Sequence, residues 1–348
     1  MAASRVCAAL ACLLLASCGG GGGGGGAAAD PAPVATAPVS APNNQSASRP
    51  ASLLFWSGFE TSTVLAAPTD CYANGCWQRP SGVDANTGSN WASGIWGNAP
   101  AFQMIENSAT SATPANIGSY IVNQIVSTTG HKGTPTQALA QTIAKSGCNG
   151  GAMSCGTGSQ GDGSTQDPLM FLSNADIPEA YVSKWVYLQP DLMTAVMSSP
   201  TWIDLFEWKT PDPIDYRFQV AIQNYSGGAA HWMTIGDAYA PSYTEFWRVY
   251  ADNVPVPLGR WFKLEVYWKR APDASGRFWA AVDGQVILDR PGANYGVRAD
   301  HIDRVMAHQV YTGGSYPFST TIDDLQVWNT WPAAAAGDTW YDPPYAPH

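Results

Sequence analysis

Short runs in which apolar and polar residues alternate fill the second half of the chain. The clearest is Trp261–Lys269, where Phe262, Leu264, Val266 and Trp268 occupy alternate positions. Successive side chains of a β-strand point to opposite faces, so this spacing predicts a strand with one buried and one more polar face. Turn residues such as Gly and Pro separate the runs, as connections between strands require.

The same pattern recurs and predicts a set of strands. We expect them at Leu53–Phe59, Tyr181–Gln189, Trp202–Lys209, Tyr216–Asn224, His231–Ile235, Phe278–Val282, Gln285–Leu288, Arg304–Tyr311 and Thr321–Trp328. Asp283 and Gly284 separate two of these runs and form the strongest short hairpin signal. Strands at such spacing indicate an all-β fold, a two-sheet antiparallel β-sandwich in which the first strand pairs near the last.

The segment 71–178 differs, because it is rich in Gly, Ser, Thr and Asn and its periodicity is weaker. We expect long loops and edge strands along one rim of the sandwich, with a short helix at Gln137–Lys145. Loops of this length are usually functional or disordered. The folded domain is expected at 51–332, followed by a poorly ordered tail at 333–348.

The N-terminus has the features of an export signal. Arg5 precedes a short apolar run, and Leu15-Ala16-Ser17-Cys18 is similar to a bacterial lipobox. We therefore expect a signal peptide at 1–17 and a lipid anchor on Cys18, which would be the only attachment to the membrane. The alternative is an ordinary signal peptide with a chance cysteine.

Residues 18–50 are expected to be a flexible linker. An unbroken glycine run, Gly19–Gly26, is followed by a stretch rich in Ala, Pro and Ser, which is typical of a tether. Gly19, directly after the cysteine, resembles the sorting signal of lipoproteins that Gram-negative bacteria send to the outer membrane. The expected location is therefore the outer membrane or the cell surface.

Four cysteines would remain in the mature chain, namely Cys71, Cys76, Cys148 and Cys155. An even number in an exported protein predicts two disulfides, for which three connectivities exist. The short spacings favour Cys71–Cys76 and Cys148–Cys155. Metal ligation is disfavoured because no histidine lies at finger-like spacing.

Composition narrows the range of partners. Lys and Arg total 17 against 27 Asp and Glu, for a net charge of −10, which argues against a nucleic-acid-binding protein. The 15 Trp residues suggest planar surfaces on which sugar rings stack, although cores also contain Trp. No apolar run is long enough for a transmembrane helix. We expect a monomer whose partner is a polysaccharide.

Two segments carry a resemblance to a known family. Gly259-Arg260-Trp261-Phe262-Lys263-Leu264-Glu265-Val266-Tyr267-Trp268 is followed by Gly276-Arg277-Phe278-Trp279-Ala280-Ala281-Val282-Asp283-Gly284-Gln285. This succession resembles concanavalin A-like jelly rolls, and among them the heparin-lyase-type and alginate-lyase-type polysaccharide lyases. The resemblance spans residues 181–328 and implies a lyase that cleaves a uronate-containing polysaccharide by β-elimination.

The catalytic motifs of that family match in part. Its central strand carries Gln-Ile-His or Gln-Trp-His, and here Glu207-Trp208-Lys209 stands at that place. A later strand ends in Lys-Ala-Gly-x-Tyr, matched by Ala307-His308-Gln309-Val310-Tyr311. The resemblance implies that Tyr311 is the acid/base, whereas the other reading is a strand aromatic under the next loop. His308 alternates with Tyr311, so we expect it in the core or on the convex face.

β-Elimination requires a base for the C5 proton, an acid for the leaving O4 and neutralisation of the uronate carboxylate. A Tyr acts as base when nearby cations favour its phenolate, and Lys209 and His231 could supply them as assisting catalytic residues. The expected substrate contacts are Arg217, Gln309, Glu207, Gln189, Gln219 and Trp185. For Lys209 and His231 the competing interpretations are a surface lysine and a loop-edge histidine.

Two other functions remain open. One is a non-catalytic carbohydrate-binding surface lipoprotein that kept the sandwich. The other follows from Trp202-Ile203-Asp204-Leu205-Phe206-Glu207, which is similar to the Glu-x-Asp-x-x-Glu strand of laminarinase-type glycoside hydrolases. Two-carboxylate hydrolysis needs an acid and a nucleophile, and Trp202 occupies the nucleophile position. Hydrolysis is therefore the less favoured of the two.

A structural Ca²⁺ is the one metal that the sequence suggests, and no cofactor is expected for catalysis. Glu60 follows the first predicted strand, and Asp323 and Asp324 lie in the last. In jelly rolls of this type such carboxylates often hold Ca²⁺ between the terminal strands, and hard oxygen ligands suit this ion. A solvated acidic edge is the alternative.

Overall fold

The computed structural model describes residues 50–72, 75–91, 102–108, 115–144, 169–172, 178–198, 201–210, 216–225, 229–238, 242–292, 304–308, 311–312 and 317–332. At 69–72, 75, 102–108, 169–172, 304 and 311–312 the description is limited to the backbone. All of these residues belong to one compact unit, Asn43–His348. No helix within these ranges is long and apolar enough to cross a membrane.

Several predictions concern residues outside the described ranges. These include the signal peptide, the lipidated Cys18, the linker and the C-terminal tail, together with Gln309. Cys148 and Cys155 also lie outside, and Cys71 is described by its backbone alone. Cys76 is buried against Ile117 and Ile121. The disulfide pairing, the anchor and the location therefore stay predictions.

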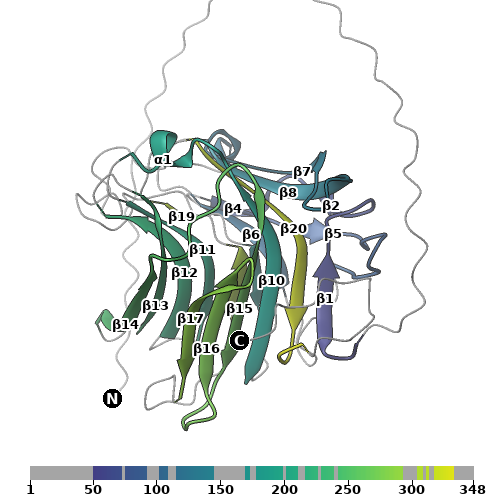
Figure 1. Cartoon of the computed structure of the whole chain (residues 1–348). Helices are drawn as coiled ribbons and strands as arrows, with labels where there is room; N and C mark the ends of the chain where they lie inside the picture. Colours follow the sequence, from purple (N-terminus) through teal and green to yellow (C-terminus); the bar gives the residue numbers. More distant parts are fainter. Residues whose placement is uncertain are drawn as a thin grey trace, which may run out of the picture. The chain divides into compact units, whose positions relative to one another are not determined.

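Two antiparallel sheets form the domain (Figure 1), as the alternation predicts. The eight-stranded sheet has the order β17 (Gln285–Pro291), β16 (Arg277–Val282), β15 (Trp261–Lys269), β10 (Glu179–Leu188), β20 (Phe318–Trp328), β8 (Pro135–Ile143) and β7 (Ile121–Thr129). Its remaining strand, β1 (Leu53–Ser57), pairs with β20, so the first strand does pair with the last.

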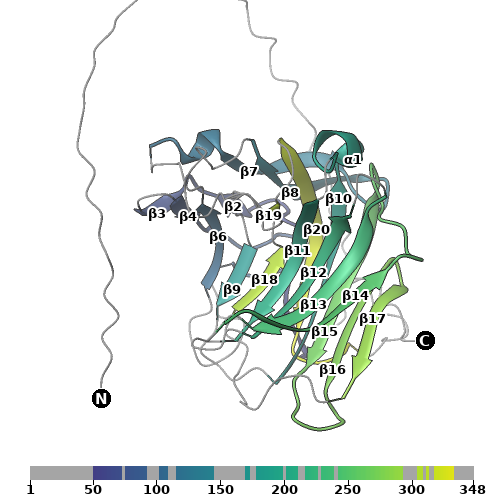
Figure 2. The same ribbon diagram turned by 90° about the vertical axis from the view of Figure 1, so that its left-hand side faces the viewer.

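The ten-stranded sheet has the order β14 (Thr244–Ala251), β13 (His231–Ala238), β12 (Tyr216–Asn224), β11 (Thr201–Lys209), β18 (Arg304–His308), β9 (Leu169–Leu172), β6 (Phe102–Ser108), β4 (Gly75–Gln78) and β3 (Thr69–Tyr72). The short β19 (Tyr311–Thr312) pairs with β11. Figure 2 shows β9, β18 and β11–β14 side by side. The other elements are β2 (Val64–Leu65), β5 (Pro80–Ser81), the 3₁₀ turn η1 (Ile117–Ser119) and α1 (Leu192–Ala195).

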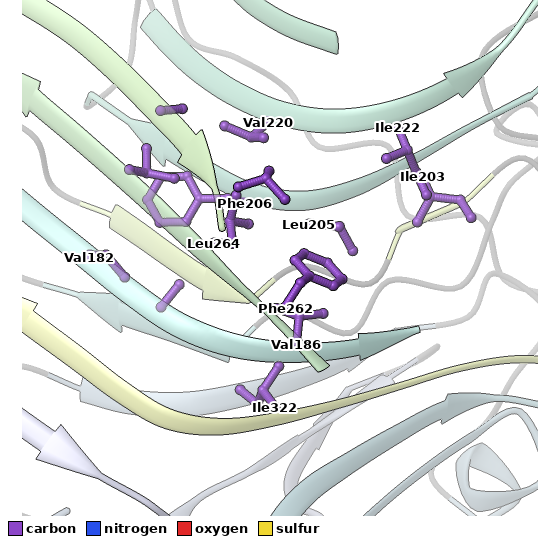
Figure 3. Close-up of a cluster of buried hydrophobic side chains, with 14 of the residues drawn as sticks. Val182, Val186, Ile203, Leu205, Phe206, Val220, Ile222, Phe262, Leu264 and Ile322 are labelled. Carbon is purple, nitrogen blue, oxygen red and sulfur yellow. The ribbon is translucent and has the colours of Figure 1, made fainter. Parts of the chain in front are cut away.

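A hydrophobic core fills the space between the sheets. The eight-stranded sheet contributes Val186 and Leu264, and the ten-stranded sheet contributes Ile203 and Phe206 (Figure 3). The even-numbered apolar residues of β15 all belong to this core, which confirms the parity expected from the sequence. In each strand, the alternate side chains that point away from this core form the outer face of the sheet.

Several elements differ from the expectation: the segment 71–178 forms β3, β4, β6, β7, β8 and β9 within the two sheets, and β14 and one predicted helix also depart from it. β14 was not anticipated, because it is a mostly exposed edge strand without a clear apolar face. The helix expected at Gln137–Lys145 is wrong, since β8 (Pro135–Ile143) occupies that segment. β8 pairs with β7 on one side and β20 on the other, and Leu139 and Ile143 face the core. This pairing overrides the helix preference of the Ala and Leu residues.

Gly236 in β13 allows a side chain to lie close against the backbone of the ten-stranded sheet. It lies opposite Trp247 of β14, and a Cβ placed on it would come within 2.3 Å of the indole ring. A contact this short requires the ring or the strand to move. Trp247 in turn packs on Phe278 of β16, with ring centroids 5.4 Å apart, so the ring has little room to yield.

We predict that Gly236→Ala lowers the free energy of unfolding by about 1–3 kcal/mol through overpacking. Gly118→Ala is the matched control, because a Cβ there meets no atom within 4 Å, and its effect should stay within about 0.5 kcal/mol. Urea unfolding followed by tryptophan fluorescence measures both. Equal stability of the two variants would contradict the packing argument.

Candidate functional site

A β-bulge in β11 brings two acidic residues to the same face. Along the ladder with β12, Asp204 lies opposite Ala221 and Phe206 lies opposite Val220, so Leu205 is an extra residue. Leu205 and Phe206 both join the core. Asp204 and Glu207 are three positions apart and would face opposite sides of a regular strand. The bulge therefore places both of them on the outer face.

Paired side chains on β11, β12 and β13 form a charged cluster on this outer face, consisting of Asp204, Glu207, Lys209, Arg217, Gln219 and Asp237. Glu207 lies opposite Gln219, and Lys209 lies opposite Arg217. The pairing of β11 with β12 therefore brings Glu207, Lys209, Arg217 and Gln219 to one face. Asp237 completes the cluster from the next strand, because it lies opposite Arg217.

Arg217 is the centre of the cluster. Its Nε and Nη2 donate to the two carboxylate oxygens of Asp237 at 2.7 and 2.6 Å, a bidentate pair. Its Nη1 lies 3.8 Å from Glu207 Oε1, and Lys209 Nζ lies 3.3 Å from the same oxygen. Glu207 and Asp237 are almost fully buried. The two cations are thus held in fixed positions by buried carboxylates.

Asp204 differs from the other carboxyl groups of the cluster. Burial raises its pKa well above the ordinary value, and the neighbouring Glu207 raises it further, whereas Arg217 opposes the shift. Gln219 Nε2 donates to Asp204 Oδ2 at 3.1 Å. A carboxyl group whose pKa is raised keeps its proton, and with it an O–H to donate, to a higher pH than an ordinary aspartic acid. Perturbed groups of this kind gather at functional sites.

Burial also raises the pKa of Asp237, although the hydrogen bonds from Arg217 oppose this effect. The opposing effects match the geometry, since the guanidinium contacts both oxygens.

Tyr311 and Arg304 are placed by strand register. Tyr311 of β19 lies opposite Asp204 of β11, and Arg304 of β18 lies opposite Lys209. Residues directly opposite each other in an antiparallel pair share a face. Positions 304 and 311 therefore belong to the outer face that carries the charged cluster.

Beyond the charged cluster, the same face becomes apolar and aromatic. Ala221, Met233 and Ile235 form a small buried group against which Trp202 and Tyr250 pack. His231 lies near this end of the sheet, opposite Gln223. Its Nδ1 is 2.8 Å from Asp252 Oδ1. The structure therefore separates His231 from Lys209, with which the sequence analysis had grouped it as an assisting catalytic residue.

Two predicted substrate contacts lie away from the charged cluster, in the other sheet or directly after one of its strands. Trp185 is in β10, where it stacks on His131 with ring centroids 4.0 Å apart. Gln189 follows β10; its Nε2 donates to Asp191 and its Oε1 accepts from the Ser319 amide. Trp185 lies in the eight-stranded sheet and Gln189 directly after its strand β10, whereas Arg217 lies in the ten-stranded sheet. The structure does not group them with the charged cluster.

The predicted calcium ligands do gather around one point of the eight-stranded sheet. Oxygen atoms of Asp323 and Asp324 lie with a nitrogen of His131 within 4.8 Å of one another. Thr136 Oγ1 donates to Glu60 at 2.6 Å and lies 3.4 Å from Asp323 Oδ2. His131 is a member that the sequence analysis did not anticipate.

The electrostatics of this acidic group favour a bound cation. Burial, together with the charge of Asp324, raises the pKa of Asp323 to about 9. Burial also raises the pKa of Glu60. A cation would remove the repulsion among these carboxylates, and their oxygens suit Ca²⁺. The donor set therefore fits the ion, except that an imidazole nitrogen is an unusual partner for it.

Comparisons with known proteins find similar folds and no relative in sequence. No protein-family model and no curated protein matches the chain. An endo-β-1,4-glucuronan lyase from the fungus Trichoderma reesei is 13% identical over 60% of this chain and 88% of its own, with a TM-score of 0.41. The alginate lyase Aly36B is 12% identical over 77% of this chain and 96% of its own, with a TM-score of 0.39.

The binding domain of botulinum neurotoxin serotype D/C is also similar, at 9% identity over 60% of this chain and 43% of that chain, with a TM-score of 0.33. The structural neighbours thus include polysaccharide lyases and the binding domain of a toxin. Likenesses of this size do not identify an activity.

We predict that Arg217→Met lowers the free energy of unfolding by about 3–5 kcal/mol, because it leaves the buried Asp237 carboxylate without its partner. Arg277→Met is the matched control: Arg277 makes a similar two-bond contact with Asp289, but both side chains are far more exposed. Its loss should cost about 1 kcal/mol or less. Chemical denaturation at neutral pH measures both, and similar losses would contradict the role given to burial.

Proposed function

We propose that the outer face of the ten-stranded sheet is the catalytic face of a polysaccharide lyase that cleaves a uronate-containing chain by β-elimination. One observation carries the proposal. Tyr311 lies in register with Asp204, whose pKa is raised, on the face that also carries the fixed cations Lys209 and Arg217. A phenol, a neutral acid and cations are the groups that this elimination needs.

The first requirement is to make the C5 proton of the uronate acidic. Removing this proton moves charge onto the carboxylate of the sugar, so the site must stabilise that charge as it develops. A neutral Asp204 would donate its O–H to a carboxylate oxygen, a role that protonated carboxyl groups play in other enolising sites. Gln219 holds Asp204 through its amide.

The second requirement is proton transfer. In the proposed reaction Tyr311, as phenolate, takes the C5 proton, the C4–O4 bond breaks, and a C4=C5 double bond forms. The proton taken by the phenol then passes to the leaving O4. Lys209 and Arg217 favour the phenolate, because a nearby positive charge lowers the pKa of a phenol. No redox partner or metal is needed for this balance.

The apolar end of the face is proposed to bind neighbouring sugars of the polymer. Trp202 and Tyr250 present aromatic surface there, and Tyr225 packs against Tyr250 with ring centroids 4.7 Å apart. Sugar rings stack on such surfaces. We propose His231, at this end, as a substrate contact and not as an assisting catalytic group.

A structural Ca²⁺ is proposed at Glu60, Asp323 and Asp324, with His131 beside it. These residues lie on the eight-stranded sheet, so the ion would stabilise the terminal strands and take no part in the elimination. Attachment to the cell surface through a lipid on Cys18 is proposed on the sequence alone and would bring the domain to extracellular polymers.

The lyase proposal predicts an unsaturated product. Incubation with alginate, glucuronan and heparin should raise the ultraviolet absorbance for at least one polymer, and Tyr311→Phe should lower turnover by about 10²–10⁴-fold. Tyr187→Phe is the control, because Tyr187 packs on Trp261 in the eight-stranded sheet and should leave turnover unchanged.

The other outcomes of this assay identify the competing functions. Binding of a polymer without turnover would favour the carbohydrate-binding alternative. New reducing ends without ultraviolet absorbance would favour hydrolysis, in which Asp204 and Glu207 would be the two carboxyl groups. Turnover that survives Tyr311→Phe at the wild-type level would overturn the assignment of the acid/base.

The metal proposal predicts stabilisation by Ca²⁺. At about 100 times its dissociation constant the ion should raise the free energy of unfolding by about 2.7 kcal/mol relative to chelator. Asp323→Asn should abolish this difference, and the exposed Asp191→Asn should retain it. Thermal unfolding in calcium and in chelator makes the comparison, and a wild-type protein that does not respond would exclude the site.

A further inference from the structure

A lysine lies inside the hydrophobic core between the two sheets. Lys184 belongs to β10, with Val182 and Val186 on the same inward-facing parity, and its exposed fraction is 1%. Figure 3 shows the part of this core between β10 and β11, where Val186 and Leu205 are labelled. Lysine is almost never fully buried unless its amine has partners, so the contacts of Lys184 require a reason.

The amine of Lys184 reaches across to the ten-stranded sheet. Its Nζ donates to the Leu205 carbonyl oxygen at 2.6 Å and to the Ala307 carbonyl oxygen. Its third partner is His308 Nδ1, at 2.8 Å. No carboxylate is among these three partners.

These contacts are consistent with a neutral amine. Burial lowers the pKa of Lys184 well below the ordinary value, and burial also lowers the pKa of His308. A neutral amine has two N–H groups for the two carbonyls and a lone pair that accepts a hydrogen bond from His308 Nδ1–H. This tautomer, which we assign from the hydrogen bonding, leaves His308 Nε2 as an acceptor.

Both carbonyls belong to the extra residues of β-bulges. Leu205 is the extra residue of the β11 bulge, between Asp204 and Phe206. Ala307 occupies the same kind of place in β18, where the register with β9 shifts between Met306 and His308. A bulge interrupts the hydrogen-bond ladder at its extra residue. Lys184, in the opposite sheet, thus donates hydrogen bonds to the carbonyl oxygens of both extra residues.

The two bulges decide which residues share the outer face. Met306 lies opposite Glu207, and Tyr311 lies opposite Asp204. Asp204 and Glu207 are three positions apart, and Met306 and Tyr311 are five positions apart. Strict alternation would place the members of each pair on opposite faces. The extra residue Leu205 restores the common face of Asp204 and Glu207, and the register shift at Ala307 is the described break between Met306 and Tyr311.

We propose that Lys184 is a positioning residue, whose amine fixes both bulges and thereby holds Asp204, Glu207 and Tyr311 on the catalytic face. The catalytic part of this inference rests on the proposed lyase function. The structural part does not, because the bulges are present whatever the face does.

The test compares Lys184→Met with Lys263→Met in the full chain. Met keeps the length and the apolar stem of the side chain but removes the amine. Lys263 is the matched control, because it is also a buried lysine of the eight-stranded sheet, in β15, and its Nζ lies 3.9 Å from Glu265 Oε1 in that same sheet. A displacement of about 1 Å in a catalytic group costs about 100-fold in rate.

We expect Lys184→Met to lower kcat by about 100-fold with little change in KM, and Lys263→Met to leave kcat near the wild-type value. Amide hydrogen exchange supplies a second readout. Exchange at 201–209 and 304–308 should accelerate in Lys184→Met and stay as in the wild type in Lys263→Met. A Lys184→Gln variant, which keeps two N–H donors, should recover part of both properties.

Wild-type kcat together with wild-type exchange in Lys184→Met would overturn the inference, as would a loss of kcat that Lys263→Met matches. If the wild-type protein has no lyase turnover, the proposed function fails, and the exchange measurement alone decides the role of Lys184. If Lys184→Met does not fold, Lys184→Gln is compared with Lys263→Met instead. Faster amide exchange at 201–209 in Lys184→Gln alone then supports the inference. Exchange at the wild-type rate in Lys184→Gln overturns it.

Discussion

Strict alternation of side chains is the constraint on which the charged cluster depends. A strand can present every second residue to one face, so a cluster of ionisable groups on one face must come from alternate positions or from a break in the ladder. This sheet uses both. β12 supplies Arg217 and Gln219 by alternation, whereas β11 supplies Asp204 and Glu207 through its bulge. The site is therefore built as much by the irregularities of the sheet as by its regular strands.

The regular strands are also the part that the sequence predicts well. The bounds of β12 and β15 agree with the apolar runs residue for residue, because both strands have one face in the core. β14 escaped prediction since a mostly exposed edge strand has no apolar parity to detect. β8 was mistaken for a helix because Ala and Leu favour helices locally, and only its neighbours β7 and β20 make it a strand.

The site was predictable to the extent that parity decides it. Alternation alone puts Glu207 with Lys209 and Arg217 with Gln219, and only the pairing of β11 with β12 brings the two pairs to a common face. Asp204 could join only through an extra residue, which leaves no signature in the sequence. Trp185 was predicted as a substrate contact together with Arg217, and the structure places it in the other sheet, because local patterns do not say which strands become neighbours. Lys184 reads in the sequence as one polar residue in an apolar run, and its partners lie more than twenty residues away.

The balance of charge narrows how an anionic sugar would be held. Among the described side chains of the cluster, Lys209 and Arg217 are matched by Glu207 and Asp237, with contacts between 2.6 and 3.8 Å. An ionised Asp204 would make this group net negative and repel a uronate, whereas a protonated Asp204 leaves it neutral. Attraction to the sugar carboxylate must then come from the O–H of Asp204, or from Arg304, whose position faces the same way. A hydrogen bond from a neutral acid strengthens as the carboxylate gains charge, so such a site would favour the transition state over the bound substrate.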